Sequence, residues 1–154
     1  MQGTPPSATW LKPPSADAAV VIVSSATLPP YMNHQLHRAI DDWDQVAHLV
    51  VQQSGAFMQD WLQAGSNPDE PTLAATCQAS QLLSCVAKGC FLLDVEVGPV
   101  PSLTWLGSVR GHPLRLVRLG KEASSHAAMD QQVEEILALT RTLAKSVLQE
   151  RCGL

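Results

Sequence analysis

The sequence predicts a single α+β domain behind a proline-rich N-terminal arm. The chain has 154 residues, the usual size of one domain. Stretches with helical spacing of apolar residues are separated by stretches that are β-branched or alternate between apolar and polar residues. The expected order is strand, helix, helix, three-stranded antiparallel meander, helix. Residues 1–17 are assigned to the flexible arm and residues 18–154 to the domain.

The arm and the first strand are predicted from composition. The segment "MQGTPPSATWLKPPSAD" holds four prolines, which disfavour both helix and sheet ladders. Trp10 stands out from the polarity of this segment, and we expect it to dock onto the domain or onto another chain. The β-branched run "VVIV" at residues 20–23 then predicts a strand, which "TLPPY" ends.

The spacing of apolar residues predicts one long helix over residues 33–64. Asn33 is the expected N-cap, and Gly65 is the expected stop. The apolar stripe steps by four and three through Leu36, Ile40, Trp43, Ala47, Val50, Ser54, Phe57 and Trp61. A second helix, capped by Asn67 or Asp69, is expected to run to about Lys88.

After Gly89 the pattern becomes that of strands. Leu93, Val95 and Val97 alternate with two acidic residues, which predicts a half-buried strand over 91–97. The segments "SLTWLGSV" and "LRLVRLG" follow after turns, so an antiparallel meander is expected over 91–119. The remaining segment is predicted as a helix with Ser124 or Ser125 as its N-cap.

The composition narrows the classes of partner and the compartment. A net charge of −4 gives no general attraction to nucleic acid or to an anionic membrane, so neither partner is expected. The four cysteines form no close C-x-x-C pair, which favours free thiols over a zinc site or a disulfide scaffold. With no signal-peptide pattern at its start, the chain is expected to be cytoplasmic. No cofactor or metal is expected.

One polar cluster is a candidate metal or acid/base site. On a continuous helix, His37, Asp41, Asp44 and His48 would share one narrow strip. The two histidines would lie about 16 Å apart along the axis, too far for one ion to reach both. A solvated helix face is therefore the expected role, and a metal-dependent enzyme is the alternative.

A basic cluster is a candidate anion site. Arg110, His112 and Arg115 lie around the last two predicted strands, and a guanidinium binds phosphate or carboxylate through paired hydrogen bonds. The second candidate function is thus an anion-dependent enzyme or ligand-binding protein that uses the Arg110 turn.

The apolar stripes on the predicted helices favour a protein that binds other proteins. The sequence contains neither a nucleophile elbow nor a phosphate-binding glycine loop. Large apolar residues on a helix stripe are favoured at contact surfaces. We expect a non-enzymatic adaptor, chaperone-like protein or complex subunit that binds another protein or a second copy of itself. The expected contact residues are Trp43, Val50, Phe57, Trp61 and Trp105.

Overall fold

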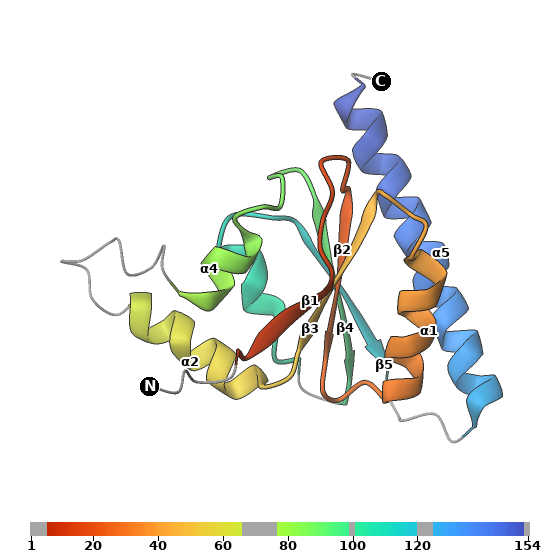
Figure 1. Ribbon diagram of the computed structural model, residues 1–154, viewed down its shortest axis with the longest axis horizontal. Coiled ribbons are helices and arrows are strands. Elements are labelled where there is room, and N and C mark those ends of the chain that lie inside the picture. The colour runs from red at the N-terminus through yellow and green to blue at the C-terminus, as the bar shows by residue number, and fades with distance from the viewer. Residues whose placement is uncertain (1–5, 66–76, 99–100, 120–124, 153–154) are drawn as a thin grey trace.

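The computed structural model describes residues 6–65, 77–98, 101–119 and 125–152, and within them it contains a five-stranded sheet and four α-helices. The prediction of mixed helices and sheet is confirmed at this coarse level. The elements in chain order are β1 (Ala8–Lys12), β2 (Val20–Ser25), α1 (Pro30–Ile40), β3 (Val46–Val51), α2 (Ser54–Gly65), α4 (Gln78–Leu83), β4 (Phe91–Val97), the 3-10 helix η1 (Thr104–Ser108), β5 (Leu114–Leu119) and α5 (His126–Arg151) (Figure 1).

Four of the five strands run parallel, and β1 is an antiparallel strand at one edge. The order across the sheet is β1-β3-β2-β4-β5. The chain passes from β2 outward to β3, then crosses back past β2 to reach β4 and β5. In open sheets with such a reversal, ligands bind outside the carboxyl ends of the strands.

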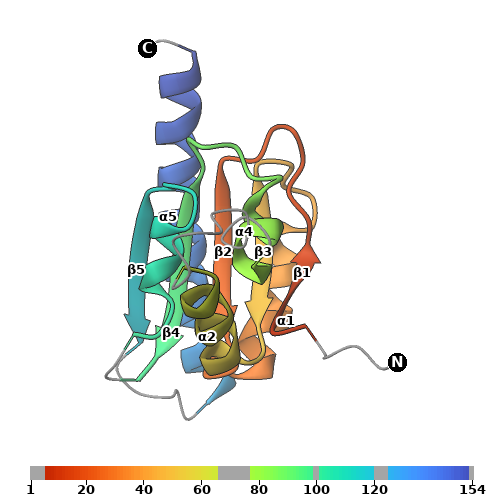
Figure 2. The ribbon, with the colours of Figure 1, turned by 90° about the vertical axis from the view of Figure 1, so that its left-hand side faces the viewer.

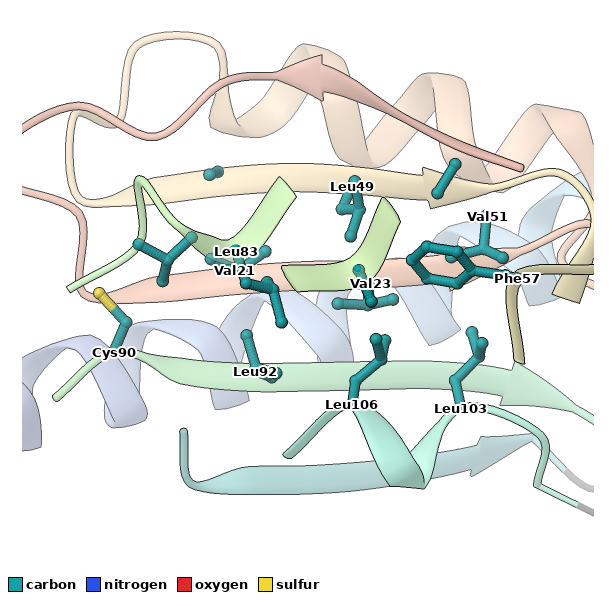
Figure 3. Packing of buried hydrophobic residues seen from close by; sticks show 14 of the residues in the cluster. Val21, Val23, Leu49, Val51, Phe57, Leu83, Cys90, Leu92, Leu103 and Leu106 are labelled. Carbon is teal, nitrogen blue, oxygen red and sulfur yellow. The ribbon is translucent and has the colours of Figure 1, made fainter. Parts of the chain in front are cut away.

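Helices cover both faces of the sheet and divide the core in two. Figure 1 shows α1 and α5 on one side of the sheet, with α2, α4 and η1 on the other. Phe57, Leu83 and Leu106 pack onto the second side, over Val23 and Leu49 (Figure 3). Because both faces are covered, every residue of β2 is buried, as is usual in parallel sheets.

The predicted helix over residues 33–64 is wrong, because β3 interrupts it. Its two ends are helical, in α1 and α2, and Leu36 and Ile40 are buried as the stripe predicts. Between them "VAHLVV" is rich in β-branched valine and pairs with β1 and β2. Asn33 lies inside α1, whose N-cap is Pro29, whereas α2 does end at Gly65.

Within the described residues, the predicted second helix is confirmed over Gln78–Leu83. Helix α4 spans Gln78–Leu83, and its N-cap is Cys77, whose sulfur accepts from the Ser80 amide. The predicted caps Asn67 and Asp69 lie outside the described residues. The helix ends well before Lys88.

The antiparallel meander is also wrong. The first and third predicted strands exist as β4 and β5, but they are parallel neighbours. The segment between them forms η1 instead of a strand, and Leu103 and Leu106 from this segment are buried against the sheet. Because η1 carries the chain back across the face of the sheet, β5 begins at the same end as β4.

Part of the predicted arm is the edge strand β1. Thr9, Trp10 and Leu11 have high or moderate preference for strands, and the prolines lie outside them, where an edge strand tolerates proline. Trp10 packs on the core of this domain, one of the two expected alternatives. A register shift follows Trp10, and such irregularities with a terminal Lys12 discourage pairing with other strands.

The last helix is the prediction that agrees best. Helix α5 begins at His126, and the side chain of Ser125 accepts from the Ala128 amide as an N-cap. Its C-terminal turns extend past the end of the sheet (Figure 2). Among the described helices, none has the length and apolar character needed to cross a bilayer. All four cysteines are free thiols.

Candidate functional site

An apolar groove opens on the α1 side of the sheet, at the carboxyl ends of β2 and β3. Its volume is about 410 Å³. The lining comes from β1, the loop after β2, the first turns of α1 and the end of β3. We call it the Leu11 groove, and its residues are Thr9, Leu11, Ser25, Ala26, Leu28, Pro30, Asn33, Val50 and Gln52.

The groove exists because α1 leaves part of this face uncovered. Thr9 is paired with Val50 in the β1–β3 register, and Leu11, at the register shift between Trp10 and Lys12, lines the same groove. No described side chain covers Leu11 fully, and it remains 44% exposed. Val50 is the one half-buried residue of β3, whose other residues are all buried.

The lining combines an apolar floor with a few polar groups. Leu11 and Val50 are its exposed and half-buried apolar residues, Leu28 is buried beside them, and Asn33 of α1 is a polar residue of the lining. Binding sites for ligands and peptides commonly have this composition, in which apolar walls give affinity and a few polar groups fix orientation. The groove therefore fits an apolar guest that also forms one or two hydrogen bonds.

A chain of buried polar side chains leads inward from Asn33. The Ser24 hydroxyl donates to Asn33 Oδ1 at 2.6 Å, and Ser24 Oγ lies 2.9 Å from His48 Nε2. Ser24 and His48 have no exposed surface. Burial, with a smaller contribution from His37, lowers the pKa of His48 to about 4. At neutral pH the His48 ring is therefore uncharged.

This polar chain does not activate a nucleophile. Because the Ser24 proton is directed to Asn33, His48 Nε2 must carry a proton and donate it to Ser24 Oγ. The remaining basic atom, His48 Nδ1, has no partner among the described residues. Ser24 is also closed to any substrate, since it is fully buried. The chain instead ties α1 to β2 and β3 beneath the groove.

A second group of buried polar side chains, Asp94 and Glu96 of β4, lies on the face of the sheet that η1 covers. Glu96 accepts hydrogen bonds from the Ser102 amide at 2.8 Å, from the Ser102 hydroxyl at 2.8 Å and from the Leu103 amide at 3.3 Å. These bonds, together with Asp94, hold the pKa of Glu96 below its ordinary value although burial opposes them. Glu96 is thus an ionised anchor for the segment before η1.

Asp94 is the uncharged partner in this pair. It has no exposed surface, and burial is the main cause that raises its pKa to about 9, followed by the hydrogen bonding and charge of Glu96. Its oxygens have no other hydrogen-bond partner among the described residues. At neutral pH Asp94 is therefore a protonated acid in the core.

The five predicted contact residues lie in three separate places. Val50 lines the Leu11 groove, and Trp43 lies in a second groove beside α5. Phe57 is fully buried, with its ring edge-on to Trp105 at 5.3 Å between centroids. Trp61 stacks on Trp105 at 4.8 Å. The prediction of Phe57 as a contact residue is wrong for this fold, because the ring is part of the core.

The structure brings two of the three predicted anion-binding residues together. Arg110 and His112 line a cavity of about 440 Å³ that also includes Lys88. Arg110 Nε is engaged by the Ser80 carbonyl at 2.9 Å, and His112 is buried with Nε2 at 3.2 Å from the Val86 carbonyl. Arg115 is exposed on β5 and does not line this cavity.

The predicted His/Asp strip does not exist, because its four residues lie on three different segments. His37 is on α1, Asp41 and Asp44 are exposed in the following turn, and His48 is buried on β3. Only His37 and His48 influence each other electrostatically. Among the described residues, no group of three or more metal-ligating side chains is placed to hold an ion.

Sequence reasoning missed most of the Leu11 groove. Leu11 was assigned to a flexible arm, and Asn33 was assigned to a helix cap. The available signal was the segment "ATWLK" between two pairs of prolines, whose β-favouring residues fit a short edge strand. If this segment is taken as an edge strand, Thr9 and Leu11 are expected on the same face of the sheet.

Comparison with known proteins assigns the chain to no family. No protein-family model matches the chain, and no curated protein matches it with significance.

Proposed function

We propose that the protein is a non-enzymatic protein-binding domain that takes an apolar segment of a partner protein into the Leu11 groove. The observation that supports this most is the exposure of Leu11. It is 44% exposed inside a concave surface that also contains Leu28 and Val50. A leucine in such a place is covered by water only until another apolar group displaces that water.

The expected contribution of this contact is moderate but sufficient for recognition. Complete burial of a fully exposed leucine side chain is worth about 1.5–3 kcal/mol, so covering Leu11, which is 44% exposed, would gain roughly half of that, and a guest leucine could gain up to the full amount. Thr9, Asn33 and Gln52 supply hydrogen-bonding groups around the apolar floor. A few anchor residues of this kind commonly provide most of the binding energy at an interface.

The chain offers a matched pair of substitutions that tests the proposal. Leu11→Ser removes apolar area inside the groove, and Leu62→Ser removes it from α2 on the other side of the sheet, where the leucine is 47% exposed. We expect Leu11→Ser to reduce capture of the partner about ten-fold or more, a loss of about 1.4 kcal/mol. The measurement is quantitative mass spectrometry of proteins retained by each immobilised variant under native conditions.

The control separates loss of the groove from a general loss of apolar surface. Proteins retained equally by the wild type and Leu62→Ser, and lost with Leu11→Ser, would support the proposal. If both variants retained the same proteins as the wild type, the groove would not be the binding surface. Circular dichroism of both variants establishes that the fold is unchanged.

A further inference from the structure

A second groove lies at the other end of β3, between the turn after α1 and the C-terminal half of α5. Its volume is about 500 Å³. Its apolar lining residues include Trp43 and Leu148, and the guanidinium of Arg141 lies 4.8 Å from the centre of the Trp43 ring. We call it the Trp43 groove, and its residues are Trp43, Gln45, Val46, Arg141, Ala144, Lys145 and Leu148.

The two sides of the Trp43 groove carry opposite charge. Arg141 and Lys145 are one helical turn apart on α5 and form the basic side. The turn after α1 contributes Trp43 and Gln45 to the other side, and the exposed aspartates of its sequence "DDWD" at residues 41–44 flank Trp43 outside the lining. Among the described residues, neither Arg141 nor Lys145 is found in an ion pair; both are exposed, and the Arg141 guanidinium lies over the Trp43 ring.

Among the described residues, Lys12 is a positive charge on which all three aspartates act. The ammonium of Lys12 donates to the Ile40 and Trp43 carbonyls, and it lies close enough to all three aspartates for their charges to act on it. The three aspartates of the turn outnumber Lys12, so negative charge remains beside Trp43, and Arg141 and Lys145 of α5 lie across the groove from it.

From this arrangement we propose that the Trp43 groove is a homodimer interface with two-fold symmetry. A two-fold axis near Trp43 sets the basic side of one copy against the acidic turn of the other, and the reverse contact follows from the same symmetry. Trp43 and Leu148 of both copies then become buried between the charges. This surface is separate from the Leu11 groove, so the proposal does not depend on the proposed function.

The charge pattern favours a second copy over other partners. An acidic peptide would be attracted by Arg141 and Lys145 but repelled by the adjacent aspartates. A basic peptide would be attracted by the aspartates but repelled by Arg141 and Lys145. The best match is a surface with the same two charges in reversed order. A second copy presents that surface by symmetry, together with a tryptophan, a residue enriched at the centres of interfaces.

Charge exchange between two variants tests the interface. Arg141→Glu with Lys145→Glu places acidic α5 side chains against an acidic turn, and Asp42→Lys with Asp44→Lys places basic groups on both sides. Each double variant alone is expected to dimerise about ten-fold more weakly than the wild type or worse. An equimolar mixture of the two is expected to recover dimers, because each contact then joins opposite charges.

Sedimentation velocity of the intact chain at up to about 100 µM provides the readout. Arg38→Glu with Lys88→Glu is the matched control, since it reverses two exposed charges outside the Trp43 groove. The control is expected to dimerise as the wild type does. A monomeric wild type, wild-type dimerisation by either double variant, or a mixture that stays monomeric would each overturn the proposal. Circular dichroism is used to confirm that every variant is folded.

Discussion

The Asp94→Asn variant is expected to be more stable than the wild type at pH 8.5 and to lose much of the wild-type dependence on pH. Asp94 keeps its proton in the folded protein up to a pKa of about 9, while the unfolded chain releases it above the ordinary value of 3.8. The unfolded state is thus favoured increasingly as pH rises from about 4 to about 9. The wild type should lose up to about 1.4 kcal/mol of unfolding free energy per pH unit in this range.

Urea denaturation at about pH 6.5 and about pH 8.5 measures this effect, which should reach about 2.7 kcal/mol between the two conditions. Asparagine has a similar shape and does not titrate, so its variant should change much less. Asp42→Asn removes an exposed carboxylate and should retain the wild-type slope. Equal slopes in Asp94→Asn and the wild type would show that Asp94 is not protonated in the folded protein.

The second large effect concerns His48 and has the opposite sign. The pKa of His48 is lowered from 6.5 to about 4, so the folded protein keeps the ring neutral where the unfolded chain takes up a proton. Its contribution to stability is complete above about pH 6.5 and is lost as pH falls toward 4. Between pH 6.5 and pH 4.5 this amounts to up to about 2.7 kcal/mol of unfolding free energy.

His48→Leu should remove this acid sensitivity, whatever its effect on absolute stability. The quantity to compare is the change in unfolding free energy between about pH 6.5 and about pH 4.5 for each protein. His34→Gln is the matched control, because His34 is exposed on α1 and its loss should leave the wild-type slope in place. If His48→Leu lost stability on acidification as steeply as the wild type, the buried neutral ring would be refuted.

Helices and strands were predicted correctly where their own residues determine the local conformation. Helix α5 has a side-chain N-cap at Ser125 and an apolar stripe that remains buried along its length. Strand β2 is a β-branched run that the following prolines end. In both, the local preference of the chain agrees with the tertiary environment.

Strand β3 was missed because distant segments decide its conformation. Its residues continue the four-and-three spacing of the preceding helix, so the pattern alone favours helix through Val50. In the structure β3 lies between β1 and β2, and its backbone pairs with both. Similarly, the alternation of Asp94 and Glu96 with apolar residues predicts a strand with one solvent-exposed face. In the structure η1 covers that face and both side chains are buried. The sequence of β4 gives no sign that η1 packs there.

The Leu11 groove was unpredictable for the same reason. Its lining comes from four segments between residues 9 and 52, and it depends on where α1 stops covering the sheet. Val50 lines the groove, but its predicted neighbours on a helix stripe, Phe57 and Trp61, lie on the other face of the sheet. Which residues share a surface follows from the topology, which the sequence patterns did not supply.

Site-specific photo-crosslinking tests the central claim, that the Leu11 groove binds a protein partner. A photoreactive phenylalanine analogue at position 11 is placed within the groove, and the same analogue at position 62 occupies a comparably exposed position across the sheet. The proposal predicts cross-links to a distinct partner protein from position 11 and none to that protein from position 62. An absence of protein cross-links from position 11, or identical products from both positions, would contradict it.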